Sequence, residues 1–394
     1  MTSSLRLQCK MHQTLCQHLP QELNKPQRDN LSWVIAGLHE AVHVHLPKKI
    51  ASECVGAAQL ESKTKQVRRF LANEATGPAA LLRASREASF EGSRPSDGPI
   101  RLLVDTLELS GERQVLMAAI AYRRRALPVC WQVRRRTGVS DADQQKSLLA
   151  KLSKRIEEAC EARSEAEAPE AEAPEAEVPE VEAPEVIVIG DGSFHSTELM
   201  SYLSDKDWFY RLRLHSDSYV RLSKEGSWQQ LGDLAPEEGG EYRYLNGVYV
   251  TKTDPYGPVS IAICHADGEE DPWFIATSEQ QEADYLTLRT YSRRMWIEEL
   301  FGDLQAGGFQ LQKSGLYEPA RLSRLVMALS WTYVWLMNVG VWATKRGFRK
   351  LVGRTDRRDR SYAEIGRRYI QRCMTNGKPL HVSIKPYFRK LSGS

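Results

Sequence analysis

Two short, mostly apolar runs constrain the fold of this chain more than any other feature. Residues 186–189 are Val-Ile-Val-Ile and lead into a turn that contains Asp191; residues 100–104, apolar apart from one arginine, lead into Asp105. A strand that is apolar on both sides is expected to be buried on both faces, as in the centre of a sheet covered by helices. The pattern predicts an α/β (α+β) fold, a mixed sheet flanked by helices, in which an aspartate ends each of two central strands.

The segment between these two runs adds two strands and a helix. Strands are expected at residues 115–122 and 126–133, and three strands joined by short turns indicate an antiparallel meander. Apolar residues then recur every three or four positions from Asp143 to about residue 162, with Asp141 as a candidate N-cap. The chain therefore places a helix between the meander and the second apolar strand.

An imperfect five-residue repeat, rich in Glu and Pro, lies just before the second apolar strand. Prolines at this period exclude helix and strand, and repulsion between glutamates favours an extended chain. We expect residues 157–185 to form an acidic, Pro-rich disordered loop. Two roles stay open. The simpler one is a passive linker; the other is a mimic of DNA charge that covers the basic C-terminal segment until DNA displaces it.

Residues 215–271 differ in character from the segments on either side. Short polar and aromatic runs alternate there with turn residues, which indicates a small β-rich insertion. Asn246 and Gly247, placed between alternating residues, predict the turn of a β-hairpin. A last strand is expected at residues 273–277.

Positive charge is concentrated at the C-terminal end. The formal net charge is only +3, but residues 345–394 contain fifteen Lys or Arg against three acidic residues. Such asymmetry indicates a polyanionic partner, and nucleic acid fits better than a membrane, because the basic segment has no apolar face. We expect residues 346–394 to form a basic tail of a cytoplasmic protein that is associated with the nucleoid when bound to DNA.

Two further features bear on the same expectation. The longest apolar stretch, residues 325–343, is long enough to span a membrane but contains polar residues. We therefore expect a buried core helix. The seven cysteines form no CxxC pair, which indicates reduced thiols rather than disulfides or a zinc site.

Residues 1–95 are expected to be helical, because their apolar residues recur at helical spacing. A basic cluster that includes Lys65, Arg68 and Arg69 lies on one of these helices. Two interpretations stay open for it: a module that grips DNA, or an ordinary helical cap with a solvated charged face.

The stretch from Tyr291 to Leu304 predicts an amphipathic helix. Tyr291, Arg294 and Glu298 recur at steps of three and four residues, so they share one face, while the apolar residues form another. A solvated helix often carries an Arg–Glu pair at this spacing, worth only ~0.2–0.5 kcal/mol, and that is the structural alternative to a functional site.

The spacing of these three residues resembles a signature of the insertion-sequence-four family of DDE transposases. In that family Tyr, Arg and Glu follow one another with two and three residues between them. The Glu is the last of three metal-binding carboxylates, and a Lys follows it after six intervening residues. Here Gln305 stands at the lysine position. The resemblance covers about residues 95 to 345 and implies an RNase H-like fold with a β-rich insertion.

By this resemblance, Asp105, Asp191 and Glu298 are the catalytic residues and the ligands of two Mg²⁺ (or Mn²⁺) ions. Asp105 and Asp191 are expected to bridge one ion and Glu298 to complete a second site. Two such ions activate the attacking oxygen and stabilise the leaving oxygen of a phosphoryl displacement. For each aspartate alone, a turn or cap at the end of a strand is the commoner role.

The resemblance also implies contacts with DNA. Tyr291 and Arg294 would contact the DNA terminus near the scissile phosphate, and the loss of the family lysine at Gln305 is expected to weaken end binding without removing the metal site. Lys313 is a candidate substitute for that lysine. Trp273 is a candidate for stacking on a flipped base, against the alternative of core packing. Lys65, Arg68 and Arg69 would belong to an N-terminal DNA-binding domain.

The expected organisation is a helical N-terminal domain, a catalytic core in two parts, a β-rich insertion between them and a basic tail, at residues 1–95, 96–214, 215–271, 272–345 and 346–394. The expected activity is cut-and-paste DNA transposition on double-stranded DNA by a homodimer, with no membrane partner. Two alternatives stay open: a catalytically inactive transposase-derived DNA-binding protein, and an RNase H-like nuclease that acts on RNA or branched DNA.

Overall fold

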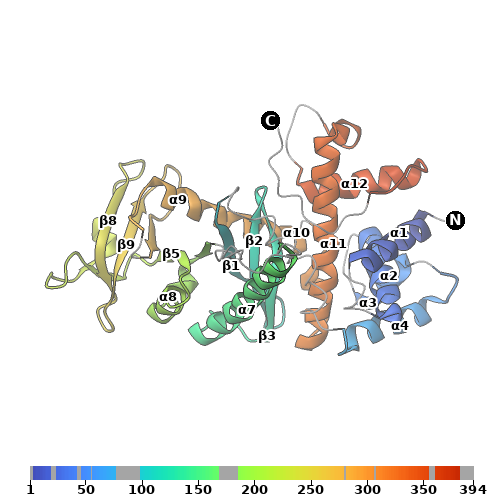
Figure 1. Cartoon of the computed structure of the whole chain (residues 1–394), viewed down its shortest axis with the longest axis horizontal. Coiled ribbons are helices and arrows are strands. Elements are labelled where there is room, and N and C mark those ends of the chain that lie inside the picture. The colour runs from blue at the N-terminus through green and yellow to red at the C-terminus, as the bar shows by residue number, and fades with distance from the viewer. Residues whose placement is uncertain are drawn as a thin grey trace, which may run out of the picture.

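A mixed sheet runs through the protein, with helices against both of its faces and a helical bundle at one end (Figure 1). In this computed structural model, the chain is described over residues 3–18, 24–41, 46–54, 56–76, 98–167, 185–278, 281–305, 308–354 and 360–381. The predicted α/β class with a mixed sheet is confirmed.

The sheet has ten strands in the order β3-β2-β1-β4-β5-β10-β9-β8-β6-β7. Their bounds are β1 Ile100–Leu109, β2 Arg113–Tyr122, β3 Arg125–Arg135, β4 Val186–Gly190, β5 Phe209–Leu214, β6 Tyr219–Arg221, β7 Gln229–Gln230, β8 Arg243–Val250, β9 Tyr256–Cys264 and β10 Trp273–Thr277. The first three strands pair antiparallel, as predicted, while β4 is parallel to both β1 and β5.

The described residues contain ten α-helices, with short 3₁₀ turns between some of them. The helices are α1 Ser3–His18, α2 Lys25–Ala41, α3 Leu46–Glu53, α4 Leu60–Ala72, α7 Ala142–Glu167, α8 Thr197–Ser204, α9 Tyr285–Tyr291, α10 Met295–Leu304, α11 Pro319–Lys345 and α12 Tyr362–Thr375. The 3₁₀ turns are η1 Gly192–Phe194, η2 Leu231–Leu234, η3 Ser292–Arg294, η4 Leu311–Lys313 and η5 Phe348–Leu351.

Two apolar layers hold the helices to the sheet. On one face, even-numbered residues of β1, such as Leu102 and Val104, pack with the buried residues of α7 and α8. On the other face, Leu103 and Leu107 pack with α10 and α11. Because side chains alternate along a strand, Asp105 points toward the α10 side.

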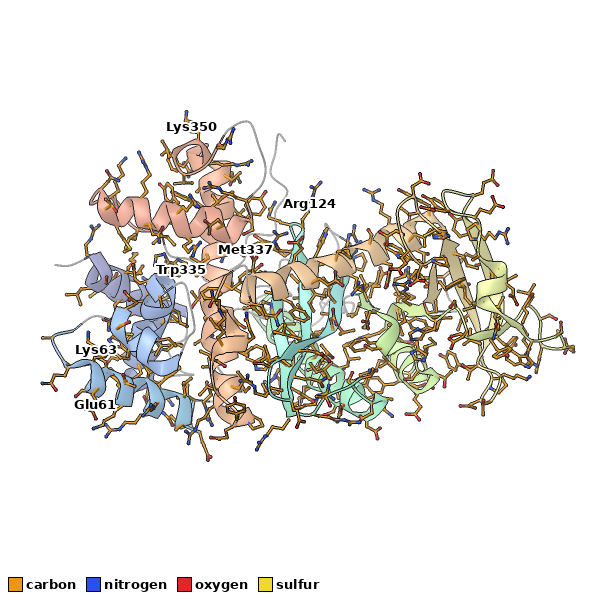
Figure 2. The ribbon with its side chains drawn as sticks, turned by 180° about the vertical axis from the view of Figure 1, so that it is seen from behind. Glu61, Lys63, Arg124, Trp335, Met337 and Lys350 are labelled. Atoms are coloured by element: carbon orange, nitrogen blue, oxygen red, sulfur yellow. The ribbon has the colours of Figure 1, made fainter. Side chains whose placement is uncertain are left out.

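Helix α11 is the core helix that the apolar stretch predicts. Within the described part of the chain it is the one helix long and apolar enough to cross a membrane, and 94% of its most apolar window is buried inside the protein. Trp335 and Met337 are among its buried residues, and Figure 2 shows both on this helix between the sheet and the N-terminal bundle. Arg324 of α11 donates to the carbonyl oxygen of Leu71 at 2.8 Å, which ties α11 to α4.

The predicted β-rich insertion is continuous with the main sheet. Strand β9 pairs with β10, and β10 pairs with β5, so β6 to β9 extend the sheet sideways. The predicted hairpin turn at Asn246 and Gly247 is wrong. Both residues lie inside β8, where the register with β9 shifts between Leu245 and Val248, and the chain reverses only between β8 and β9. Gly247 (φ 69°) supplies the irregular backbone of that shift.

The first part of the predicted acidic loop is helical. Residues 157–167 belong to α7, because the glutamates there alternate with Ala and Arg rather than with Pro, and nothing breaks the helix. Residues 168–184, which contain most of the Pro-rich repeat, lie outside the described residues, as do residues 77–97 of the predicted N-terminal domain and linker.

The predicted basic tail is also corrected, because part of it is a packed helix. Helix α12 buries one face against α11, with Ser361 as N-cap. The two helices approach so closely that an added Cβ at Gly340 would meet the carbonyl oxygen of Tyr362, and one at Gly366 would meet that of Leu336. Two glycines at the crossing allow this contact. Residues 382–394 lie outside the described part.

Candidate active site

Asp105 and Asp191 lie side by side on neighbouring parallel strands. Val104 of β1 is in register with Gly190 of β4, so the next residue on each strand is an aspartate. One expectation needs correction: Asp105 does not end β1, because Thr106 to Leu109 continue to pair with β2. It does mark the point where pairing between β1 and β4 ends, and this leaves room for a carboxylate beside Asp191.

Asp191 caps the short turn η1. Its Oδ1 accepts from the backbone N–H of Ser193 at 3.0 Å and from the Ser193 hydroxyl at 2.6 Å. These two bonds orient the carboxylate.

Two histidines that sequence reasoning left without a role lie at the same turn. His195 Nδ1 (2.5 Å) and His215 Nε2 (2.9 Å) both donate to the carbonyl oxygen of Gly192, and their rings meet edge to face at 4.7 Å. An added Cβ at Gly192 would lie 2.9 Å from His215, so the glycine permits this close approach. Their spacing in sequence carries no metal-site signal, since only the turn brings them together.

Glu298 and Arg294 come from the helical run opposite these strands. The predicted single helix is three successive elements, α9, η3 and α10, and Arg294 lies at the junction of η3 and α10. The Arg294 guanidinium lies 2.5 Å from Glu298 Oε1 through Nη2 and 3.6 Å from Asp105 Oδ2 through Nη1. Arg294 therefore bridges two of the three predicted catalytic carboxylates. Its contact with Glu298 follows from their position on one helix face, as predicted.

The electrostatics of the site reflect crowded carboxylates. The pKa of Asp105 is raised to about 7, chiefly by burial and also by the charges of Asp191 and Glu298, while a hydrogen bond from the Thr106 N–H and the charge of Arg294 act in the opposite direction. For Arg294, burial alone lowers the pKa, but nearby Tyr291 and the carboxylates raise it above its ordinary value. The buried Asp105 carboxyl thus lies close enough to Asp191 and Glu298 to be affected by their charges.

A cavity of about 530 Å³ opens beside these groups. It is lined by Asp191, Glu298 and Arg294, together with Arg213 of β5 and both histidines. Val139, whose side chain is 62% exposed, also lines it, from the loop between β3 and α7. The cavity therefore joins carboxylates to two arginines, which is a suitable lining for a phosphate group.

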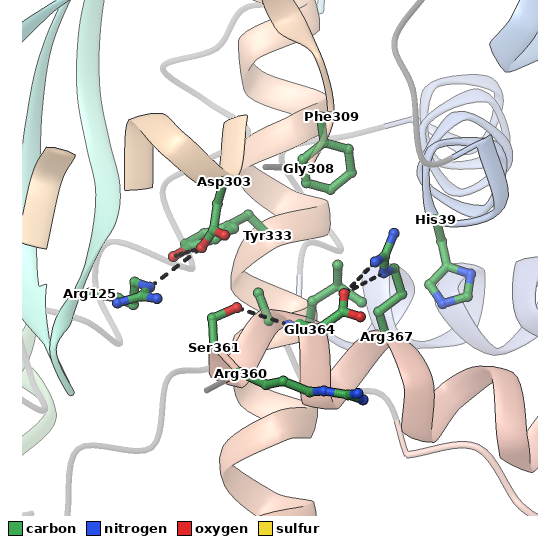
Figure 3. A pocket seen from close by; sticks show the side chains of 12 residues that line it. His39, Arg125, Asp303, Gly308, Phe309, Tyr333, Arg360, Ser361, Glu364 and Arg367 are labelled. Atoms are coloured by element: carbon green, nitrogen blue, oxygen red, sulfur yellow. Dashed lines mark hydrogen bonds and ion pairs between the residues drawn. The ribbon is translucent and has the colours of Figure 1, made fainter. Parts of the chain in front are cut away.

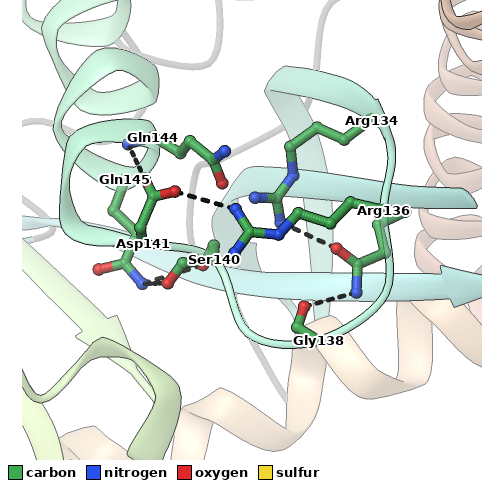
Figure 4. A network of polar contacts seen from close by, with 8 residues as sticks. Arg134, Arg136, Gly138, Ser140, Asp141, Gln144 and Gln145 are labelled. Carbon is green, nitrogen blue, oxygen red and sulfur yellow. Dashed lines mark hydrogen bonds and ion pairs between the residues drawn. The ribbon is translucent and has the colours of Figure 1, made fainter.

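A network of polar contacts holds the loop that carries Val139 (Figure 4). Gln114 donates to the Gly138 carbonyl at 2.7 Å and accepts from Arg134 at 3.1 Å. Gln145 Nε2 lies 2.9 Å from the carbonyl oxygens of Ser140 and Ser193. The last contact connects this loop to the turn that Asp191 caps.

Tyr291 and Trp273 pack against each other close to Arg294. Tyr291 is 2% exposed, its ring meets Trp273 edge to face at 5.2 Å, and burial raises its pKa to about 12. Its hydroxyl oxygen is buried and has no hydrogen-bond partner among the residues that the structure describes. Trp273 is partly buried against the core, which supports packing as one of its roles. Contacts of both residues with DNA stay predictions.

Gln305 and Lys313 lie toward the far end of β1. Gln305 caps α10 at its C-terminal end, and its side-chain amide donates to the Glu108 carbonyl at 2.8 Å. The position of the family lysine is therefore used here to fasten α10 to β1. Lys313 is exposed on η4, whose neighbour Gln312 accepts from the Ser110 hydroxyl at 3.0 Å.

The basic cluster Lys65, Arg68 and Arg69 is not part of this cavity. All three side chains are exposed on α4, in the N-terminal bundle on the far side of α11 (Figures 1 and 2). Lys65 forms an exposed ion pair with Glu61 at 3.2 Å. Because these side chains are exposed, the cluster is compatible both with a face that binds DNA and with an ordinary solvated face.

A second cavity, of about 330 Å³, lies where α2, α10, α11 and α12 meet (Figure 3). At its wall the Tyr333 hydroxyl donates to Asp303 at 3.3 Å, and Arg125 of β3 lies 3.5 Å from the same carboxylate. Burial raises the pKa of Asp303 to about 6. No lining residue is shared with the first cavity. Asp303 connects α10 to α11 and to the sheet.

The donor chemistry beside the first cavity fits a hard divalent cation, because Asp191 and Glu298 line the cavity, Asp105 lies near both, and carboxylate oxygens are preferred by Mg²⁺ and Mn²⁺. Within the described ranges, however, no three His, Cys, Asp or Glu residues form a ready-made ligand set. Arg294 lies between Asp105 and Glu298 instead. Holding a cation would thus require Asp105, Asp191 and Glu298, with Arg294 moved aside.

Comparison with known proteins adds no relatives. No protein-family model matches the chain, and no curated protein matches it.

Proposed function

We propose that this protein is a DDE transposase that cuts and rejoins DNA by phosphoryl transfer. The observation that carries the proposal is that Arg294 contacts both Asp105 and Glu298 while strand register places Asp191 beside Asp105, so residues of two strands and a helix far apart in sequence come together. A chance helical pattern would not bring an aspartate from each apolar strand to the same arginine.

The order of elements supports an RNase H-like core for this proposal. A three-strand antiparallel meander carries Asp105 on its first strand, a helix follows, and the next strand pairs parallel to the first and leads into Asp191. The helix with Glu298 then covers the same sheet face. This is the order that the resemblance to insertion-sequence-four transposases implies.

The chemistry would follow from the lining of the cavity. Bound divalent ions would supply activation of the attacking oxygen and stabilisation of the leaving oxygen. Arg213 and Arg294 would hold the phosphate, whose negative charge they complement. Water attacks phosphorus, the bond to the 3′ oxygen breaks, and that oxygen leaves as a hydroxyl group. The freed hydroxyl then attacks a phosphate of the opposite strand, whose bond to its own 3′ oxygen breaks so that this oxygen leaves as a hydroxyl, which forms the hairpin that the resemblance implies, with two subunits pairing two ends.

Cleavage of a plasmid that carries the coding region with its flanking DNA tests the proposal, with breaks mapped by sequencing. We expect breaks at defined positions in Mg²⁺ or Mn²⁺ and none in EDTA. Asp191→Asn is expected to abolish cleavage and leave DNA affinity nearly unchanged, while the control Asp205→Asn, on an exposed side chain at the end of α8, cleaves normally. Cleavage by Asp191→Asn at the wild-type rate would refute the proposal.

One alternative has support of its own. Gln305 stands at the position of the family lysine, and its side-chain amide donates to the Glu108 carbonyl. This favours an inactive transposase-derived protein that binds DNA and cuts nothing. A wild-type protein with DNA affinity but no cleavage in either metal would establish that alternative. Preferential cleavage of an RNA–DNA hybrid over duplex DNA would instead indicate an RNase H-like nuclease.

A further inference from the structure

Arg294 lies between Asp105 and Glu298 at the wall of the cavity. Its side chain is 15% exposed. Its two terminal nitrogens contact different carboxylates, Glu298 at 2.5 Å and Asp105 at 3.6 Å. Asp105 is equally enclosed, at 14% exposure. A guanidinium in this place offsets the repulsion between carboxylates that burial would otherwise make costly.

The same oxygens are those that a divalent cation would need. Asp105 and Glu298 would help to hold a divalent cation, and its charge beside the guanidinium would repel it strongly in a partly buried site. Arg294 and the cation therefore cannot both keep these contacts. Arg294 also lines the cavity, so a phosphate placed there can accept its hydrogen bonds once it turns away from the carboxylates.

We propose that Arg294 is an internal counter-ion that competes with the divalent cation for Asp105 and Glu298 and is drawn away by a DNA phosphate. This inference rests on the proposed function and adds a regulatory consequence to it. DNA binding prepares the metal site, and the cation in turn frees Arg294 for DNA, so each ligand raises the affinity of the protein for the other. Without DNA, the arginine weakens cation binding at the site.

Titration calorimetry with Mn²⁺ on the full chain, without DNA, tests the competition. Removal of the guanidinium in Arg294→Gln is expected to tighten Mn²⁺ binding by about tenfold, within the usual range of coupling between sites. The control Arg289→Gln removes the same charge from an exposed position on α9 and is expected to bind Mn²⁺ like wild type. The melting temperature gives a second readout: Mn²⁺ should raise it more in Arg294→Gln than in wild type.

The coupling has its own measurement. A duplex fragment that contains a mapped cleavage position should tighten Mn²⁺ binding in wild type, and this effect should disappear in Arg294→Gln. Equal Mn²⁺ affinity in wild type and Arg294→Gln, both measurable, would overturn the inference and leave the proposed function standing. If neither protein binds Mn²⁺ with or without DNA, and neither melting temperature responds, the proposed function is refuted together with the inference.

Discussion

Asp105 and Asp191 occupy equivalent positions on adjacent parallel strands, each one residue beyond the register pair formed by Val104 and Gly190. Backbone hydrogen bonds between β1 and β4 therefore set the separation of the two carboxylates. Ligand positions fixed by a sheet are more rigid than positions on loops. The elevated pKa of Asp105 is the electrostatic consequence of this closeness and of burial.

The pH dependence of stability should report on Asp105. Its pKa is about 7 in the folded protein and has an ordinary value of 3.8, so between these values the folded state holds more protons than the unfolded state. Stability contributed by the protonated carboxyl is present below about pH 4 and is lost as the pH rises to about 7. In metal-free buffer, Asp105→Asn should therefore be more stable than wild type at pH 8 by about 2–4 kcal/mol.

Thermal melting of both proteins from pH 4 to pH 8 measures this difference. The gain in melting temperature should shrink toward pH 4. Asp303, whose pKa is also raised, to about 6, is present in both proteins and cancels in the comparison. A gain that is constant with pH would show that Asp105 does not titrate in this window.

Glu298→Gln should abolish cleavage while Glu299→Gln should not. Glu298 faces Arg294, whereas its neighbour Glu299 pairs with Arg125 at 3.1 Å, outside the cavity. Loss of a metal-holding carboxylate is expected to slow cleavage by about a thousandfold or more. Initial rates on the plasmid substrate give the comparison, and equal rates for the two variants would remove Glu298 from the catalytic set.

Gln305→Lys, which restores the residue found in the family, should strengthen DNA binding. One more phosphate contact is expected to steepen the dependence of log affinity on log salt concentration by about one. Fluorescence anisotropy at several salt concentrations measures this slope. Gln305→Met is the control, since it also loses the bond to the Glu108 carbonyl and adds no charge; an equal slope in both variants would argue against a phosphate near position 305.

The exposed cluster on α4 offers a test of the predicted N-terminal DNA grip. Replacement of Lys65, Arg68 and Arg69 by Ala should lower DNA affinity by about tenfold or more and reduce the salt slope by up to about 2.7. Replacement of the exposed Lys151 and Lys154 of α7 by Ala serves as the charge control. If both variants lose affinity equally, the α4 cluster is an ordinary solvated face.

Gly366→Ala should destabilise the protein by about 2–3 kcal/mol, because the new methyl group would meet the backbone of α11 at Leu336. Gly302→Ala is the matched control. It lies on the exposed face of α10 with no neighbour within 4 Å, and alanine there should stabilise the helix by about 0.5–1 kcal/mol. Urea unfolding of both variants decides whether α12 is packed in solution as it is in the structure.

Local sequence patterns were enough to predict the central elements of the fold. The two apolar strands, the meander, the helix after it and the buried core helix follow from apolar periodicity, since burial on one or two faces leaves a direct mark on neighbouring residues. The shared face of Arg294 and Glu298 followed for the same reason. The hairpin at Asn246 failed because a turn dipeptide is also compatible with an irregular strand, and pairing with β9 decided between them.

By itself, then, the sequence determined which segments are strands and helices and which residues are available for chemistry, because those properties depend on nearby residues. Tertiary structure alone decided that Asp105 adjoins Asp191, that Arg294 lies between Asp105 and Glu298, and that His195 and His215 meet at Gly192. It also decided that α12 packs on α11 rather than extending as a tail. Each of these depends on strand register or close helix crossing between distant segments, and local periodicity carries no information about such contacts.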